Sequence, residues 1–236
     1  MPTGSATGND FGILFLHALP FDGTMWDGIA DIAPGATYAP TLYDSGPSLE
    51  NWAHRAMENT RHERLIVVGC SVGGSCALEI AAAYPNRVAE MILIGTKADH
   101  RQDPRYRDTA LDLIAKDGLA VAWDRYWAPL FSKSTAAESV ESARRAAIAL
   151  TPQSVSNGVA AFHGRPSRGN LIAHWPGPVT VITGDEDTAP GLAASAALAN
   201  AAPNGTLIVV PGCGHYVPLE KPGVLKSVLL NKIQRL

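Results

Sequence analysis

Five short apolar runs, each bounded by turn-forming residues, constrain the fold of this chain more than any other feature of its sequence. They cover residues 12–16, 65–68, 91–94, 179–182 and 207–210. An apolar run that does not alternate with polar residues is typical of a strand buried on both faces of a parallel sheet. Helical patterns lie between these runs and after the last one, at 75–84, 189–202 and 222–236. The alternation predicts an α/β fold with a doubly wound, mostly parallel sheet.

One region interrupts this alternation. Between about residues 97 and 176 no convincing strand pattern occurs, but amphipathic helical patterns cover 106–116, 119–127, 136–150 and 154–162. Helices inserted between two strands of a parallel sheet are expected to lie over the carboxyl ends of the strands. We therefore predict a core formed by residues 1–97 and 177–236, with a helical lid over residues 98–176.

Composition excludes several classes of protein. The chain has 236 residues, of which 46% are hydrophobic and 17% charged, and its net charge is −3. This balance gives no reason to expect nucleic acid or an anionic membrane as a partner. Residues 1–10 lack the basic start of a signal peptide, and three cysteines do not form a disulfide framework. A cytoplasmic protein, monomeric or homodimeric, is the expectation.

The sequence GCSVG at 69–73 follows an apolar run and precedes a helical pattern. It matches the G-x-S-x-G turn that presents a nucleophilic serine, here Ser71, between a strand and a helix. The flanking glycines are needed because so sharp a turn leaves no room for side chains. No lysine completes a Walker loop, and the glycine spacing does not fit a dinucleotide fingerprint. Cys70 lies beside the centre of the motif and is predicted to point into the core.

A serine hydroxyl needs a base to take its proton, so we expect a histidine downstream. His215 follows the last apolar run in a loop of small residues, PGCGH. The remaining histidines are expected in solvent or at the lid, except His17, which is expected to brace its loop. None stands with a carboxylate at metal-ligand spacing, so we expect no metal and no cofactor.

The acid that orients the histidine should follow a strand between the serine and the histidine. The loop after run 179–182 offers Asp185, Glu186 and Asp187. We favour Asp187, because the loop must leave the strand before the acid can turn toward the imidazole. Asp185 remains an alternative, and Asp99 is a further one.

An oxyanion hole needs two backbone N–H groups directed at one point. The residue after the nucleophile, Val72, is expected to supply one of them. The other should come from the loop after the first strand, where Leu19 is our choice and Ala18 the alternative.

Four segments in order, LHALPFDGTMW, GCSVGG, GDEDTAP and GCGHYVPLEKP, resemble the oxyanion loop, nucleophile turn, acid loop and histidine loop of the α/β-hydrolase fold superfamily. The G-x-x-D match within the third assigns the acid role to Asp187. The segments DGLAVAWDRYWAPLFSK and LTPQSVSNGVAAFHGRP look like the cap of 3-oxoadipate enol-lactonases and their relatives.

This resemblance implies a hydrolase that cleaves a small carboxylic ester or lactone without a cofactor, through an acyl-enzyme on Ser71. Two alternatives stay open. The same triad serves carbon–carbon bond hydrolases or lyases as acid–base machinery, and some members of the fold are ligand-binding signalling receptors.

The lid is expected to select the substrate. Trp123, Tyr126 and Trp127 have the spacing of one helical face. This face either packs on the core or lines a ring-accommodating pocket opposite Trp26, and Arg125 lies off it. If the substrate carries a carboxylate, four arginines are candidates to bind it: Arg105, Arg107, Arg144 and Arg165.

Overall fold

Six parallel strands form one sheet in the order β2-β1-β3-β4-β5-β6 in the computed structural model, which describes residues 11–234. The strands are β1 (Phe11–Leu16), β2 (Thr37–Tyr38), β3 (Arg64–Cys70), β4 (Val88–Ile94), β5 (Val179–Gly184) and β6 (Gly205–Val210). Five of them contain the five apolar runs. The predicted doubly wound parallel sheet is therefore confirmed.

Burial along the strands follows their position in the sheet. All seven residues of the central strand β4 are buried, as expected for a strand covered on both faces. In the edge strand β6 only Val210 is buried, and Val209 is 40% exposed. The expectation that run 207–210 is a fully buried strand was wrong, because an edge strand has a neighbour on one side only.

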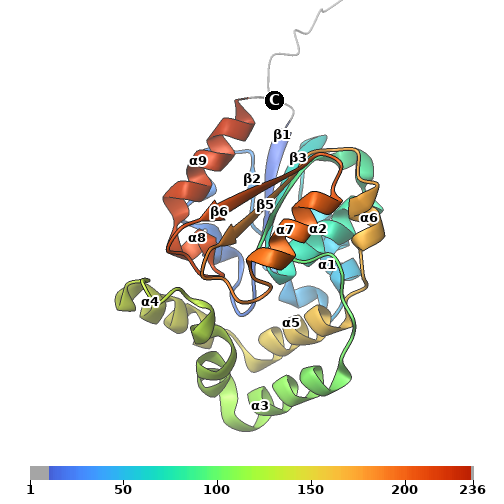
Figure 1. The fold of residues 1–236 in the computed structure, drawn as a ribbon. Helices are drawn as coiled ribbons and strands as arrows, with labels where there is room; N and C mark the ends of the chain where they lie inside the picture. Colours follow the sequence, from blue (N-terminus) through green and yellow to red (C-terminus); the bar gives the residue numbers. More distant parts are fainter. Residues whose placement is uncertain (1–10, 235–236) are drawn as a thin grey trace, which may run out of the picture.

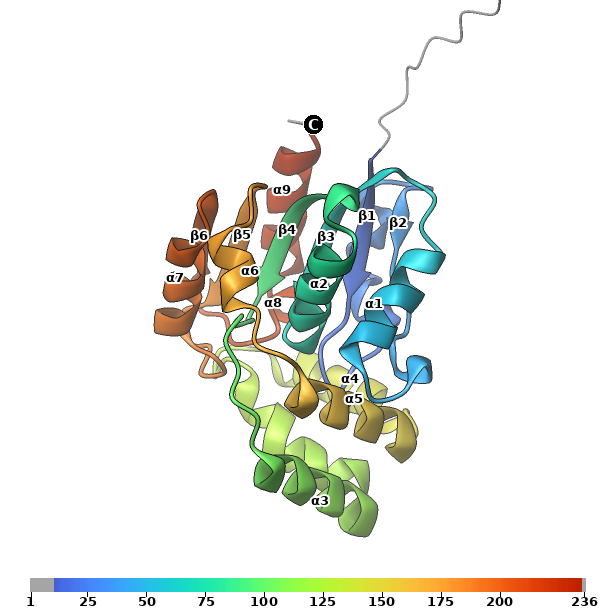
Figure 2. The same cartoon turned by 90° about the vertical axis from the view of Figure 1, so that its right-hand side faces the viewer.

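Helices cover both faces of the sheet (Figures 1 and 2). On one face lie α1 (Leu49–Glu58), α2 (Val72–Ala83) and α7 (Leu192–Ala201). On the other lie the short α8 (Val217–Glu220) and α9 (Pro222–Ile233). Helix α2 begins at the residue after Ser71, three residues earlier than its sequence pattern predicts. No helix within the described residues is long and apolar enough to cross a membrane.

The segment between β4 and β5 contains α3 (Pro104–Ala122), α4 (Ala137–Ile148), α5 (Pro152–Gly164) and α6 (Gly169–Ala173). Helices α3, α4 and α5 lie beyond the carboxyl ends of the strands, whereas α6 returns to the side of the sheet beside α7 (Figure 2). Two helices were expected over 106–116 and 119–127. In the structure the first of them continues as α3 to Ala122, with a kink at Gly118, whose φ of 81° departs from helical geometry.

Candidate active site

Ser71 occupies a strained turn between β3 and α2. Its φ of 54° and ψ of −115° make it the one non-glycine residue with positive φ among residues 11–234. The neighbouring glycines are sterically required. A Cβ on Gly69 would lie 2.3 Å from the carbonyl oxygen of Gly73, and a Cβ on Gly73 would lie 2.1 Å from that of Leu16. The turn therefore holds the hydroxyl-bearing residue at the end of the sheet, as the motif predicts.

His215 and Asp187 form a buried pair near this turn. The Nδ1 atom of His215 lies 3.1 Å from each carboxylate oxygen of Asp187, and the two side chains are 2% and 0% exposed. Burial raises the pKa of Asp187, but hydrogen bonds from His215, the Ala189 N–H and Thr183 outweigh it and leave the pKa below its usual value. The ionised carboxylate thus keeps the proton on Nδ1 and leaves Nε2 as the acceptor nitrogen.

The other candidate acids do not reach the histidine. Asp185 is exposed, and its carboxylate accepts the N–H of Cys213 at 3.3 Å. Asp99 is also exposed and accepts the hydroxyl of Ser167 at 2.8 Å. Of the three candidates, Asp187, Asp185 and Asp99, Asp187 alone contacts the imidazole.

Ser71 and His215 line one cavity of about 370 Å³ beneath the inserted helices. Its other walls are mostly apolar and come from the inserted helices, the loop after β1 and the loops after β5 and β6. Among them are Leu19, Tyr106, Tyr126, Trp127, Val159, Phe162 and Tyr216. The hydroxyl of Ser71 and the imidazole of His215 thus face one mostly apolar cavity, the kind of space in which small molecules bind.

Two backbone N–H groups lack a protein acceptor among the described residues, that of Leu19, which lines this cavity, and that of Val72, which follows Ser71. Within the described part of the chain, neither the N–H of Val72 nor that of Leu19 donates a hydrogen bond. The N–H of Ala18 instead donates to the sulfur of Met25 at 3.4 Å. The two alternatives for the second oxyanion donor therefore differ: Leu19 has a free N–H group, whereas that of Ala18 is engaged.

His17 is buried and fully hydrogen-bonded. Its Nε2 accepts the N–H of Leu42 at 3.0 Å, and its Nδ1 lies 3.3 Å from the carbonyl oxygen of Ala18. Burial lowers the pKa of His17 to about 4, so the ring is neutral near pH 7. It braces the loop after β1, the arrangement expected from the sequence.

Cys70 is fully buried, and its sulfur lies 3.9 Å from the carbonyl oxygen of His215. Burial raises the pKa of its thiol well above the usual value. The neutral thiol lies in the core, as predicted, and is not poised as a nucleophile.

The aromatic residues expected in the pocket are separated by the structure. Trp127 lines the cavity, but Trp123 is 1% exposed and packs against Phe21 and Phe131. Residues 123–127 form a π-helical turn, so the spacing expected for an α-helical face does not apply. Trp26 is stacked on Phe15 with ring centroids 4.9 Å apart. Neither Trp26 nor Trp123 lines the cavity, so their predicted substrate contacts have no support in this arrangement.

Several residues at the site carried no signal that sequence reasoning used. Phe162 and Val159 lie on one face of α5, and Tyr216 follows the histidine. Gly95 approaches the imidazole so closely that a Cβ there would lie 2.7 Å from His215 Nδ1.

No group of three or more histidine, cysteine or acidic side chains able to hold a metal ion occurs within residues 11–234.

Comparisons with known proteins agree with this geometry. A curated relative, 2-hydroxymuconate semialdehyde hydrolase of Pseudomonas putida, is 32% identical over 174 residues, 65% of this chain and 57% of the relative. The first three curated relatives are matched over 57 to 63% of their own lengths. A thermophilic esterase from Thermogutta terrifontis, solved with malate bound, superposes with a TM-score of 0.86 at 21% identity, covering 97% of this chain and 91% of that one.

The enol-lactonase from Burkholderia xenovorans LB400 gives a TM-score of 0.82 at 17% identity, covering 96% of this chain and 92% of that one. Identities this low show a shared fold. The sequence itself matches the family described as alpha/beta hydrolase fold over residues 13–222, which include the nucleophile turn, the acid loop and the histidine loop. The chain belongs to the α/β-hydrolase fold family.

Proposed function

We propose that the chain is a serine hydrolase that cleaves a small carboxylic ester or lactone without a cofactor. The observation that carries the proposal is the buried His215–Asp187 pair, which shares a cavity with the strained Ser71. The inserted segment acts as the lid of this cavity, with walls from α3, from residues 126–130 and from α5. The names of the esterase and the enol-lactonase that share the fold support ester or lactone chemistry.

The reaction follows from the positions of these groups. The hydroxyl of Ser71 attacks the substrate carbonyl while Nε2 of His215 takes its proton, and Asp187 stabilises the resulting imidazolium. The N–H groups of Leu19 and Val72 hold the tetrahedral oxyanion, and each such donor lowers the barrier by about 3 kcal/mol. His215 then protonates the leaving oxygen. A water molecule, deprotonated by His215, hydrolyses the acyl-enzyme and restores Ser71.

A second candidate function is cleavage of a carbon–carbon bond beside a ketone with the same triad. It is favoured by the relative named 2-hydroxymuconate semialdehyde hydrolase and by one named 2-hydroxy-6-oxononadienedioate/2-hydroxy-6-oxononatrienedioate hydrolase. The two candidates need the same three side chains and differ in the bond that breaks, so substrates distinguish them.

The test combines covalent labelling with turnover. We expect a fluorophosphonate probe to label the wild-type protein at Ser71 and to leave Ser71→Ala unlabelled. The matched control Ser167→Ala changes an exposed serine that neither lines the cavity at Ser71 nor belongs to the histidine loop, and this variant should be labelled normally. Turnover is then measured on p-nitrophenyl butyrate, a γ-lactone and a vinylogous 1,5-diketone, with and without EDTA.

Labelling together with turnover of the ester or lactone supports the proposal, and exclusive turnover of the diketone supports the second candidate. A wild-type protein that is neither labelled nor active would overturn both. An unlabelled, inactive protein that a small ligand stabilises would point to a receptor, and inhibition by EDTA would contradict a cofactor-free mechanism.

A further inference from the structure

A second cavity opens on the other side of Ser71. It has a volume of about 340 Å³ and shares Ser71, Phe162 and Ala189 with the apolar cavity. Its lining includes the hydroxyls of Ser75 and Thr96 and two cationic side chains, and no carboxylate. Ser71 therefore lines both an apolar cavity and a second one that contains two cationic side chains.

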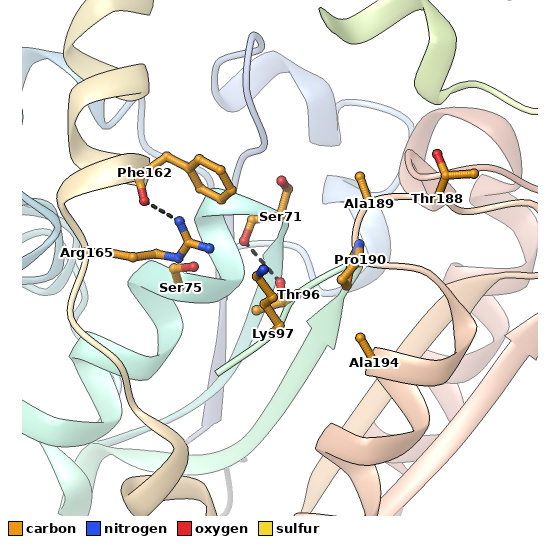
Figure 3. Close-up of a pocket in the computed structure, with 11 residues that line it drawn as sticks. Ser71, Ser75, Thr96, Lys97, Phe162, Arg165, Thr188, Ala189, Pro190 and Ala194 are labelled. Carbon is orange, nitrogen blue, oxygen red and sulfur yellow. Dashed lines mark hydrogen bonds between the residues drawn. The ribbon is translucent and has the colours of Figure 1, made fainter. Parts of the chain in front are cut away.

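Arg165 supplies the first of these cations. It is 4% exposed, and its guanidinium lies 3.8 Å from the centre of the Phe162 ring. One Nη atom donates to the carbonyl oxygen of Phe162, but Nε has no hydrogen-bond partner. Figure 3 shows the side chain reaching from the end of α5 toward the space beside Ser71.

No carboxylate within residues 11–234 forms an ion pair with Arg165. An uncompensated buried charge is unfavourable, so such groups are normally paired. Other shielded cations of the chain follow this rule: Arg168 pairs with Glu79, and Lys232 pairs with Glu90 at 2.7 Å. Burial lowers the pKa of Arg165 only to about 10, so the guanidinium stays charged near pH 7.

Lys97 supplies the second cation. It follows β4, lines the same cavity and forms no ion pair with the described residues. In Figure 3 its side chain lies below Ser71, beside Thr96, with Arg165 reaching in from the left. Burial, with smaller effects of Arg165, His100 and Arg107, lowers the pKa of the nearby His163 to about 4, so this ring adds no positive charge near pH 7.

The other arginines considered from the sequence do not compete. Arg105 is exposed. Arg107 pairs with Asp108 at 2.9 Å, and Arg144 lies 3.9 Å from Glu141 of its own helix. None of them lines either cavity at Ser71.

We propose that Arg165, assisted by Lys97, binds a carboxylate group of the substrate, so that the chain acts on esters or lactones of acids that carry a second carboxylate. This inference rests on the proposed hydrolase function, because the bound molecule is a substrate only if the chain is a hydrolase. The site itself rests on the unpaired guanidinium and the cavity that contains it. The carboxylate enters the cationic cavity, and the uncharged part of the substrate enters the apolar one.

The first test compares two substrates that differ by one charge, mono-p-nitrophenyl adipate and p-nitrophenyl hexanoate. We expect Arg165→Gln to lower kcat/KM for the adipate ester at least tenfold more than for the hexanoate ester, since a hydrogen bond between charged groups is typically worth that factor or more. Lys97→Gln should lower the ratio of kcat/KM for the adipate ester to kcat/KM for the hexanoate ester about threefold, because a more exposed charge contributes less. The matched control Arg125→Gln removes an exposed arginine and should leave the ratio unchanged.

The second test does not require turnover. Ser71→Ala protein is titrated with glutarate and adipate, and with the uncharged glutaramide and adipamide, by calorimetry. We expect the diacids to bind at least tenfold more tightly than the diamides, and Arg165→Gln in the same background to remove the difference. If the esters are not hydrolysed but the diacids bind in this way, the hydrolase proposal fails and the carboxylate site stands.

If Arg165→Gln lowers kcat/KM equally for both esters, the guanidinium only supports the fold. Equal binding of diacids and diamides would overturn the site. If Arg165→Gln does not fold, Arg165→Lys replaces it. This variant keeps the positive charge but loses the planar guanidinium, and it should retain part of the preference for the charged ligands over the uncharged ones. The wild-type protein alone remains decisive, because a carboxylate site requires it to prefer adipate to adipamide.

Discussion

The Nδ1 atom of His215 lies 3.1 Å from both carboxylate oxygens of Asp187, in a pair that is almost fully buried. A carboxylate that faces the ring edge so evenly fixes both the orientation of the imidazole and its tautomer. The Ala189 N–H holds the same carboxylate from its far side at 2.8 Å. Loss of the negative charge should therefore affect the proposed base more than the fold.

Asp187→Asn is expected to lower kcat about 10³- to 10⁴-fold, because the amide favours the wrong tautomer and cannot stabilise the imidazolium. Asp185→Asn is the matched control two residues away, and it should lower kcat less than tenfold. Steady-state rates on p-nitrophenyl butyrate measure both. The reverse ranking would transfer the acid role to Asp185.

Gly95→Ala should disturb the same pair from the opposite side. The new Cβ would lie 2.7 Å from Nδ1 and Cε1 of His215 and 3.2 Å from a carboxylate oxygen of Asp187, at a residue whose φ is +54°. A displaced base lowers the rate steeply, and we expect kcat to fall about 100-fold. Gly164→Ala has no atom within 4 Å of its added Cβ and should leave kcat unchanged. Unaltered turnover in Gly95→Ala would mean that the imidazole tolerates a shift.

Five of the six strands and the nucleophile turn could be predicted from the sequence because each depends on local patterns. Continuous apolar runs indicate buried parallel strands, and two glycines around Ser71 indicate a turn without space for side chains. Helix α1 was overlooked although Leu49, Trp52 and Ala53 begin a clear amphipathic repeat after the cap residue Ser48. Strand β2 has two residues and offers no periodicity to detect.

The lining that other segments bring to the site could not be predicted, for physical reasons. The π-helical turn at 123–127 separates Trp123 from Trp127, and no spacing rule for α-helices anticipates it. The importance of Gly95 and of Arg165 depends on what other segments bring beside them. A glycine after a strand and an arginine after a helix are common in sequences, and only the packed structure distinguishes these two.

The buried His17 should make stability depend on pH. Its pKa is about 4 in the folded protein and 6.5 as an ordinary histidine, so the unfolded chain binds its proton more readily. Stability is therefore unaffected above pH 6.5 and falls as the pH drops from 6.5 to 4, by a loss on the order of 3 kcal/mol. Urea unfolding at several pH values measures this slope. His17→Asn should flatten it, whereas His174→Gln, at an exposed histidine, should not.

Glu220 connects the histidine loop to the segment after the inserted π-helical turn. Its Oε2 accepts the N–H groups of Ser132 and Gly214 and the hydroxyl of Thr135, and its Oε1 accepts the N–H of Tyr216. These distances lie between 2.6 and 3.0 Å. One carboxylate thus fixes the backbone on both sides of His215 and ties it to the inserted helices.

Glu220→Gln replaces one carboxylate oxygen, which accepts hydrogen bonds, with an NH₂ group, which donates them. The groups that donated to that oxygen then lose their acceptor. We expect a loss of about 2 to 4 kcal/mol in the free energy of unfolding, together with a lower kcat because the loop that holds His215 loosens. Glu186→Gln is the matched control, since its Oε2 accepts the Ser132 hydroxyl and the Lys133 N–H of the same segment but no N–H of residues 214–216. It should cost stability without a comparable loss of kcat. If both variants lower kcat equally, the activity depends on the position of the 132–135 segment and not on the bonds that Glu220 makes to the histidine loop.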